Sequence, residues 1–128
     1  MDEDRPCPCG LGDDYDACCG RFHAGEPAPT AEALMRSRYS AFAVGDAEYL
    51  LRTWHPSQRP ATLTLDPDTE WKRLAVLETE DGGMSDQTGT VTFRAVYLQD
   101  GQRGVLAEKS QFVRDHGRWV YLAAVAEG

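Results

Sequence analysis

Residues 88–124, TGTVTFRAVYLQDGQRGVLAEKSQFVRDHGRWVYLAA, decide the fold of this chain. Apolar and polar side chains alternate along the runs 88–98, 104–114 and 118–126, and a similar run precedes them at 71–80. Alternation with a period of two is typical of strands that bury one face. Asp-Gly at 100–101 and His-Gly at 116–117 mark tight hairpin turns. The sequence therefore predicts four antiparallel strands.

The two hairpin turns predict which residues of neighbouring strands face each other. The predicted pairs are Phe93 with Glu108, Val91 with Ser110, Phe112 with Tyr121, and Ser110 with Ala123. One face of the sheet then collects most of the aromatic side chains together with a single carboxylate. Its predicted members are Val91, Phe93, Ala95, Tyr97, Leu106, Glu108, Ser110, Phe112, Trp119, Tyr121, Ala123 and Val125.

Two helices are predicted upstream of the strands. Thr30 stands before AEALMRSRYSAF, where apolar residues recur at helical spacing, so it is an N-cap candidate. Gly45 ends this helix, and Asp46 caps a second helix that closes at His55-Pro56. The loop that follows is predicted to hold a short strand at 62–65.

The fold class that these elements predict is α+β, with helices first and then a curved antiparallel sheet. The helices should cover the aromatic face, and the face rich in Thr, Arg, Lys and Gln should meet water or a partner. The predicted division is an N-terminal metal knuckle and linker at 1–29, followed by the body at 30–128.

The knuckle is predicted from residues 7–23, CPCGLGDDYDACCGRFH, which hold all four cysteines of the chain. Soft ligands in a segment too short for its own core are typical of a tetrahedral Zn²⁺ site. Cys7, Cys9 and Cys18 are the expected ligands, and the fourth is Cys19 or, alternatively, His23. A closed site of four protein ligands predicts a structural ion, whose removal should fray only 1–29. The other interpretations are two disulfides or free thiols.

Composition limits the kinds of partner. The chain has 128 residues, with 13 Lys and Arg against 21 Asp and Glu, a net charge of −8. This charge repels phosphate backbones and disfavours nucleic acid as a partner. No apolar run approaches the ~18 residues of a membrane span, and the acidic start differs from a signal peptide. We therefore expect no membrane contact and a cytoplasmic location, where reduced cysteines favour a metal over disulfides.

Two stretches resemble known families. CPCGLGDDYDACCG is similar to the SEC-C zinc motif, in which Cys19 falls at a position that can be histidine. AEALMRSRYSAFAVGDAEYLLRTWHPS and EKSQFVRDHGRWVYL resemble the uncharacterised YchJ family, which joins that motif to an NTF2-like domain. The resemblance implies an NTF2-like cone and no established reaction. SEC-C knuckles usually carry lysines where this chain has Asp13, Asp14 and Asp16, which argues against a partner that reads a basic knuckle.

Glu108 is the candidate catalytic residue, because the register places its carboxylate in the aromatic layer. Other NTF2-like proteins, such as ketosteroid isomerase and scytalone dehydratase, use ionisable groups in an apolar cone. In that interpretation Glu108 moves a proton, His55 assists, and Arg36 or Arg38 binds an anionic group. The other predicted pocket residues are Tyr39, Trp54, Phe93, Ser110, Phe112, Trp119 and Tyr121. The alternative is a buried Arg–Glu ion pair that only fixes helices to the sheet.

Two functions follow from the sequence. The first is a binding or adaptor protein that contacts a protein partner through the knuckle and holds a small hydrophobic ligand or none. The second is a small enzyme of isomerase, dehydratase or hydrolase type that uses Glu108 as acid or base. A cavity open to solvent, with Glu108 free of an arginine partner, would favour the enzyme. A sealed cone, with Glu108 clamped and an exposed apolar patch near the knuckle, would favour the adaptor. We expect a monomer or a weak homodimer.

Overall fold

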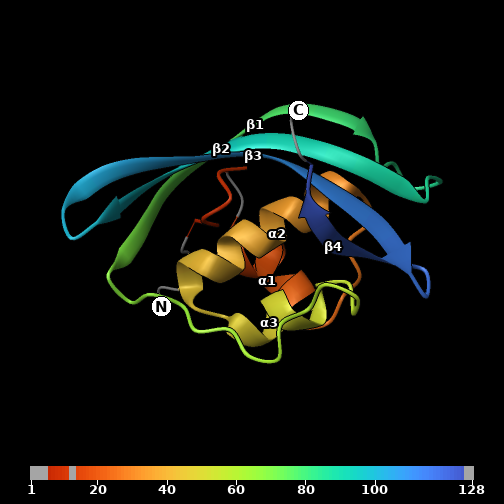
Figure 1. The fold of residues 1–128 in the computed structure, drawn as a ribbon, viewed down its shortest axis with the longest axis horizontal. Helices are drawn as coiled ribbons and strands as arrows, with labels where there is room; N and C mark the ends of the chain where they lie inside the picture. The colour runs from red at the N-terminus through yellow and green to blue at the C-terminus, as the bar shows by residue number, and fades with distance from the viewer. Residues whose placement is uncertain (1–5, 12–13, 126–128) are drawn as a thin grey trace.

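A computed structural model of the chain describes residues 6–11 and 14–125, so Asp13 of the knuckle lies outside the described residues. A curved sheet arches over the helices (Figure 1). The helical elements are η1 (Tyr15–Ala17), α1 (Cys19–His23), α2 (Ala31–Val44) and α3 (Ala47–Arg52). The strands are β1 (Thr69–Asp81), β2 (Thr88–Gln99), β3 (Gln102–Asp115) and β4 (Arg118–Ala124). The predicted α+β class is confirmed.

The strands pair antiparallel in the order β1-β2-β3-β4. Phe93 faces Glu108 and Val91 faces Ser110, as the first hairpin predicted. The second hairpin holds its predicted register only near the turn. The register shifts by one residue between Phe112 and Gln111, which places Ser110 opposite Ala124. The predicted pairing of Ser110 with Ala123 is therefore wrong. The cause is one extra residue in β4, a bulge that hairpin arithmetic cannot include.

The predicted helix caps are confirmed. Thr30 Oγ1 accepts a hydrogen bond from the Ala33 amide, and Gly45 ends α2 with a left-handed φ of 83°. Asp46 Oδ1 accepts from the Tyr49 amide at 3.1 Å and caps α3. However, α3 ends at Arg52 rather than at 55–56, and 62–65 form no strand.

The early end of α3 has a tertiary cause. The backbone of 53–55 leaves the helix to bond with β4: the Tyr121 amide donates to Thr53 O, and the His55 amide donates to Tyr121 O, both at 2.8 Å. Trp54 thereby forms a bridge to Tyr121. This junction ties the segment after α3 to β4.

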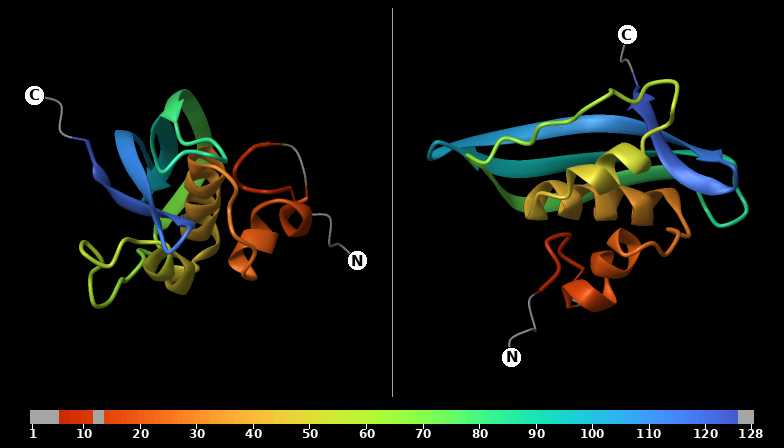
Figure 2. Two further views of the ribbon diagram at one scale, coloured as in Figure 1. Left: turned by 90° about the vertical axis from the view of Figure 1, so that its right-hand side faces the viewer. Right: turned by 90° about the horizontal axis from the view of Figure 1, so that it is seen from below.

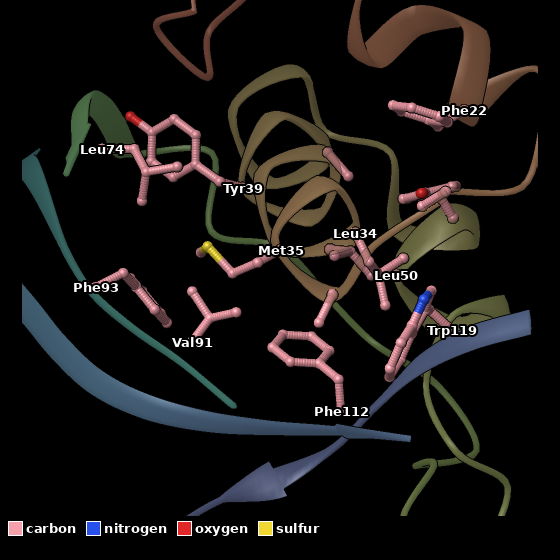
Figure 3. Packing of buried hydrophobic residues seen from close by; sticks show 14 of the residues in the cluster. Phe22, Leu34, Met35, Tyr39, Leu50, Leu74, Val91, Phe93, Phe112 and Trp119 are labelled. Atoms are coloured by element: carbon pink, nitrogen blue, oxygen red, sulfur yellow. The ribbon is translucent and has the colours of Figure 1, made fainter. Parts of the chain in front are cut away.

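Helix α2 lies between the sheet and the N-terminal segment, as Figure 2 (left) shows. Eight of its fourteen residues are buried. Its apolar side chains, among them Leu34 and Met35, pack with Val91 and Phe112 of the sheet in one core (Figure 3). Phe22 of α1 belongs to the same core. The N-terminal segment is therefore packed into the body, and the expectation that metal loss frays only 1–29 is at odds with this shared core.

Two glycines fix where α2 begins on the sheet. The Ala31 amide at the start of α2 donates to Gly82 O at 2.9 Å, just after β1. A Cβ on Gly89 of β2 would lie 2.4 Å from Gly82 Cα. Only glycine permits this approach of two backbones, because the atoms in the way cannot rotate aside. The start of α2 therefore depends on the absence of a side chain at 89.

We expect Gly89→Ala to lower the free energy of unfolding by about 2 kcal/mol or more, because its Cβ meets backbone. Gly83→Ala is the control, since its Cβ would approach only the Asp86 carboxylate, at 3.4 Å. Urea unfolding monitored by circular dichroism measures both variants. Equal stability of the two variants would contradict the proposed close approach.

Candidate functional site

The four cysteines form one buried cluster. Cys7, Cys9, Cys18 and Cys19 are each exposed by 5% or less, and their Sγ atoms all lie within 4.8 Å of one another. The Sγ atoms of Cys9 and Cys18 are 3.6 Å apart. Four ligands at ~2.3 Å around a tetrahedral ion would be separated by about 3.8 Å. The arrangement therefore fits a bound metal ion.

The chemistry of the cluster also fits a cation. Burial, and then the neighbouring Cys9 and Cys7, raise the pKa of Cys18 to about 12. Hydrogen bonding with Cys7 raises the pKa of Cys19, whereas the thiols of Cys19 and Cys9 lower the pKa of Cys7. Crowded sulfurs thus cannot all ionise by themselves at neutral pH, and a divalent ion would compensate their charge.

His23 lies outside this cluster. Its Nε2 is 2.8 Å from Ser37 O, a carbonyl that can only accept, so this nitrogen donates. Its Nδ1 is 2.5 Å from Tyr15 Oη. Both ring nitrogens are therefore engaged away from the sulfurs. The convergence of ligand atoms favours Cys19 over His23 as the fourth ligand.

The cysteine cluster contacts one face of α2. Cys7 Sγ lies 3.5 Å from Ser40 Oγ, and Arg36 Nη1 donates to Cys9 O at 3.1 Å. Arg36 Nε also pairs with Glu32 at 2.9 Å. The prediction that Arg36 lines the pocket is wrong, because its side chain leaves α2 on the side of the knuckle.

On its opposite face, α2 forms one wall of a cavity of about 230 Å³ beneath the sheet. Met35 and Tyr39 of α2 and Phe93 of β2 line this cavity, and Figure 3 shows their positions in the core. The cavity is not fully enclosed, and Leu106 of its lining is 41% exposed. The lining consists of Met35, Arg38, Tyr39, Phe42, Trp54, Trp71, Phe93, Ala95, Leu106, Glu108, Ser110, Phe112 and Tyr121.

Glu108 faces this cavity, as the register predicted. Its Oε2 accepts hydrogen bonds from Ser110 Oγ at 2.6 Å and from Tyr121 Oη at 3.0 Å. Burial, and then the Glu108 carboxylate, raise the pKa of Tyr121 to about 12, so its hydroxyl remains a donor at neutral pH. Two hydroxyls thus satisfy one oxygen of Glu108.

Arg38 is the cation of the cavity and is only 7% exposed. Its Nη1 donates to Leu50 O at 2.9 Å and to Thr53 Oγ1 at 2.8 Å. Its guanidinium also lies 4.8 Å from the centre of the Tyr121 ring. Burial lowers the pKa of Arg38 to about 10, which leaves it charged at neutral pH. Among the described side chains, Arg38 makes no ion pair with Glu108, so the structure lacks the predicted buried Arg–Glu pair.

Two further predicted residues lie elsewhere. His55 Nδ1 is 2.8 Å from Ser57 Oγ in the loop after α3, outside the cavity lining, because α3 ends before it. Trp119 Nε1 donates to Pro29 O at 3.3 Å, so this ring packs against the linker instead of the cavity. The predicted placement of His55 beside Glu108 and of Trp119 in the pocket is therefore wrong.

Sequence reasoning did not assign five lining residues to the pocket, although each carried a signal. Met35 and Phe42 belong to the helical stripe, and Ala95 and Leu106 to the predicted aromatic face. Trp71 begins the first strand run, whose register no short hairpin fixes. The missing information was the tertiary position of α2 and β1.

This architecture, a cysteine knuckle joined to a helix-covered curved sheet, defines the class of SEC-C motif proteins with an NTF2-like domain. Residues 6–21 match the SEC-C motif, and residues 30–124 match the family described as YchJ, middle NTF2-like domain. The chain belongs to the UPF0225 family.

Relatives extend over nearly the whole chain. A UPF0225 protein of Streptomyces coelicolor is 60% identical over 117 residues, which are 91% of each chain. Another, from Deinococcus radiodurans, is 46% identical over 121 residues, covering 94% of this chain and 88% of the relative.

Two solved structures share the fold. The solution structure of a SEC-C motif-containing protein from Rhodopseudomonas palustris matches with a TM-score of 0.82 and 33% identity, over 97% of this chain and 100% of that one. The crystal structure of a SEC-C motif-containing protein from Psychrobacter arcticus gives 0.78 and 26%, over 98% and 86%. The fold expected from the sequence is thereby confirmed.

We expect Glu108→Gln to change the free energy of unfolding by about 1 kcal/mol or less, because glutamine can still accept from Ser110 or Tyr121. Breaking a buried ion pair would instead cost about 3–5 kcal/mol. Denaturant unfolding of wild type and variant distinguishes the two. A loss in the larger range would restore the interpretation that Glu108 is a structural ion-pair partner.

Proposed function

We propose that this chain is a small-molecule-binding protein, with the cavity between α2 and the sheet as its ligand site. The observation that carries the proposal is an open, aromatic-lined cavity that contains Glu108 free of an arginine partner. Protein interiors are normally close-packed, so such a space with a few polar groups is typical of binding sites.

Proton transfer by Glu108 is a second candidate function of the same cavity. Its Oε1 accepts no hydrogen bond from the described residues, whereas Oε2 is held by Ser110 and Tyr121. A fixed carboxylate with one free oxygen has the form of a general base. Without His55 nearby, Glu108 would act alone, and its role as acid or base stays a prediction.

The knuckle, we propose, holds Zn²⁺ through Cys7, Cys9, Cys18 and Cys19. Four thiolates are the ligands of closed tetrahedral zinc sites, which leave no position for a substrate. The ion would hold the knuckle against α2, where Arg36 donates to Cys9 O and Ser40 Oγ contacts Cys7 Sγ. Its role would then be to fix one wall of the ligand site.

The adaptor function predicted from the sequence stays a prediction. The sulfurs are buried, and the contacts of the knuckle face α2. Leu11, which is 56% exposed, is the large apolar side chain that the described part of the knuckle offers to solvent.

The expected oligomeric state, a monomer or a weak homodimer, likewise stays a prediction. None of the helices in 6–11 and 14–125 is long and apolar enough to span a membrane.

For the zinc site we expect about one zinc per chain in protein purified under reducing conditions, because one closed site takes one ion. Cys19→Ser should lose most of this metal, and His23→Gln should retain it. Elemental analysis measures both. Chelation should also lower the melting temperature of the whole chain, because Phe22 shares the core of the body. Far less than one zinc per chain would contradict the proposal.

For the ligand site we expect Leu106→Trp to abolish binding of single-ring aromatic probes, because the indole would fill the open side of the cavity. Val105→Trp is the matched control: Val105 is 49% exposed, neighbours Leu106 in β3 and lies outside the lining. Saturation-transfer NMR on the metal-loaded full chain measures binding. Equal binding by both variants would place the ligand elsewhere and contradict the proposal.

A further inference from the structure

The part of the cavity lining formed by α2 and Trp54 carries hydrogen-bond donors that have no partner among the described residues. Arg38 uses Nη1 for Leu50 O and Thr53 Oγ1, while its Nε and Nη2 donate to none of the described residues. A buried charged donor without an acceptor is costly. Because Arg38 is only 7% exposed and lines the cavity, a ligand in the cavity can supply an acceptor for these nitrogens.

A second donor lies beside it. Trp54 Nε1 is buried and has no hydrogen-bond partner in the part of the chain that the structure describes. Trp54 also lines the cavity, and the Arg38 guanidinium lies 5.3 Å from the centre of its ring. Two residues of the cavity lining thus carry donors that none of the described residues uses.

The negative charge of the cavity, the Glu108 carboxylate, already has hydrogen-bond partners. Glu108 is partly exposed and accepts two hydroxyl hydrogen bonds. The lining therefore offers a ligand more unused hydrogen-bond donors than unused acceptors. A carboxylate supplies two oxygens in one plane, the arrangement that a guanidinium binds best.

We infer that the ligand is a small aromatic carboxylate, with its carboxylate on Arg38 and Trp54 Nε1 and its ring among the aromatic side chains. This inference rests on the proposed ligand-binding function. The cavity of about 230 Å³ is smaller than the ~300–1,000 Å³ typical of sites for drug-sized ligands. This size favours a small ligand, such as one ring with a short acidic substituent.

The test compares three probes of nearly equal shape and different charge: phenylacetate, phenylacetamide and 2-phenylethylamine. Dissociation constants are measured by calorimetry on the metal-loaded full chain at neutral pH. We expect phenylacetate to bind about tenfold or more tightly than phenylacetamide, because hydrogen bonds between charged partners are stronger than those to a neutral carbonyl. The amine should bind most weakly, since it would lie against a guanidinium.

Two variants assign the preference to residues. Arg38→Gln should reduce the phenylacetate affinity to that of phenylacetamide. Trp54→Phe keeps a ring but removes the N–H, and it should weaken phenylacetate about threefold to tenfold while phenylacetamide changes less. Trp71→Phe is the control, because it makes the same change at another lining residue and should leave the preference unaltered. If Arg38→Gln fails to fold, Trp54→Phe against Trp71→Phe still decides the assignment.

The outcomes separate this inference from the proposed function. If all three probes bind equally, or the amine binds best, the carboxylate class is wrong although the cavity still binds ligands. A preference for the amine would assign Glu108 as the counter-ion. If no probe binds, the proposed function fails, and the inference fails with it. A preference for phenylacetate that Arg38→Gln abolishes supports both.

Discussion

The burial of α2 on two sides is the constraint on which the rest of the structure depends. A helix on the surface of a domain usually keeps a broad polar stripe in water. Here eight of fourteen residues are buried, with the sulfur cluster on one side and the sheet on the other. Ser37 and Ser40 are fully buried on this helix, although they are polar. They are small enough to let the knuckle approach closely, and hydrogen bonds satisfy them.

Helical geometry explains why Arg36 and Arg38 have different roles. Two positions along an α-helix rotate a side chain by about 200°, so both arginines cannot reach the same site. Arg36 donates to the backbone of Cys9, and Arg38 enters the cavity. The sequence offered either residue to Glu108, and only the position of α2 between two layers decides between them. Helix α2 thus places one arginine against the knuckle and the other in the cavity.

Local chemistry made much of the fold predictable. Asp-Gly at 100–101 fixed the β2–β3 register, and Thr30 and Asp46 fixed two helix starts. Tertiary contacts decided the rest. The bulge in β4 and the early end of α3 arise where 53–55 bond to Tyr121, a contact between segments far apart in the chain. For this reason Glu108 was placed correctly, whereas His55 was not. The four cysteines were recognisable from spacing, but their packing on α2 was not.

The position of α2 has a consequence for the energetics of the two sites. The same helix contacts the sulfur cluster and forms one wall of the cavity. If occupancy of either site orders that wall, thermodynamic reciprocity requires the two occupancies to favour each other by the same factor. The knuckle would then lose its metal ion more readily when the cavity is empty than when a ligand fills it. The chain would behave as a single cooperative unit in which metal retention reports on ligand supply.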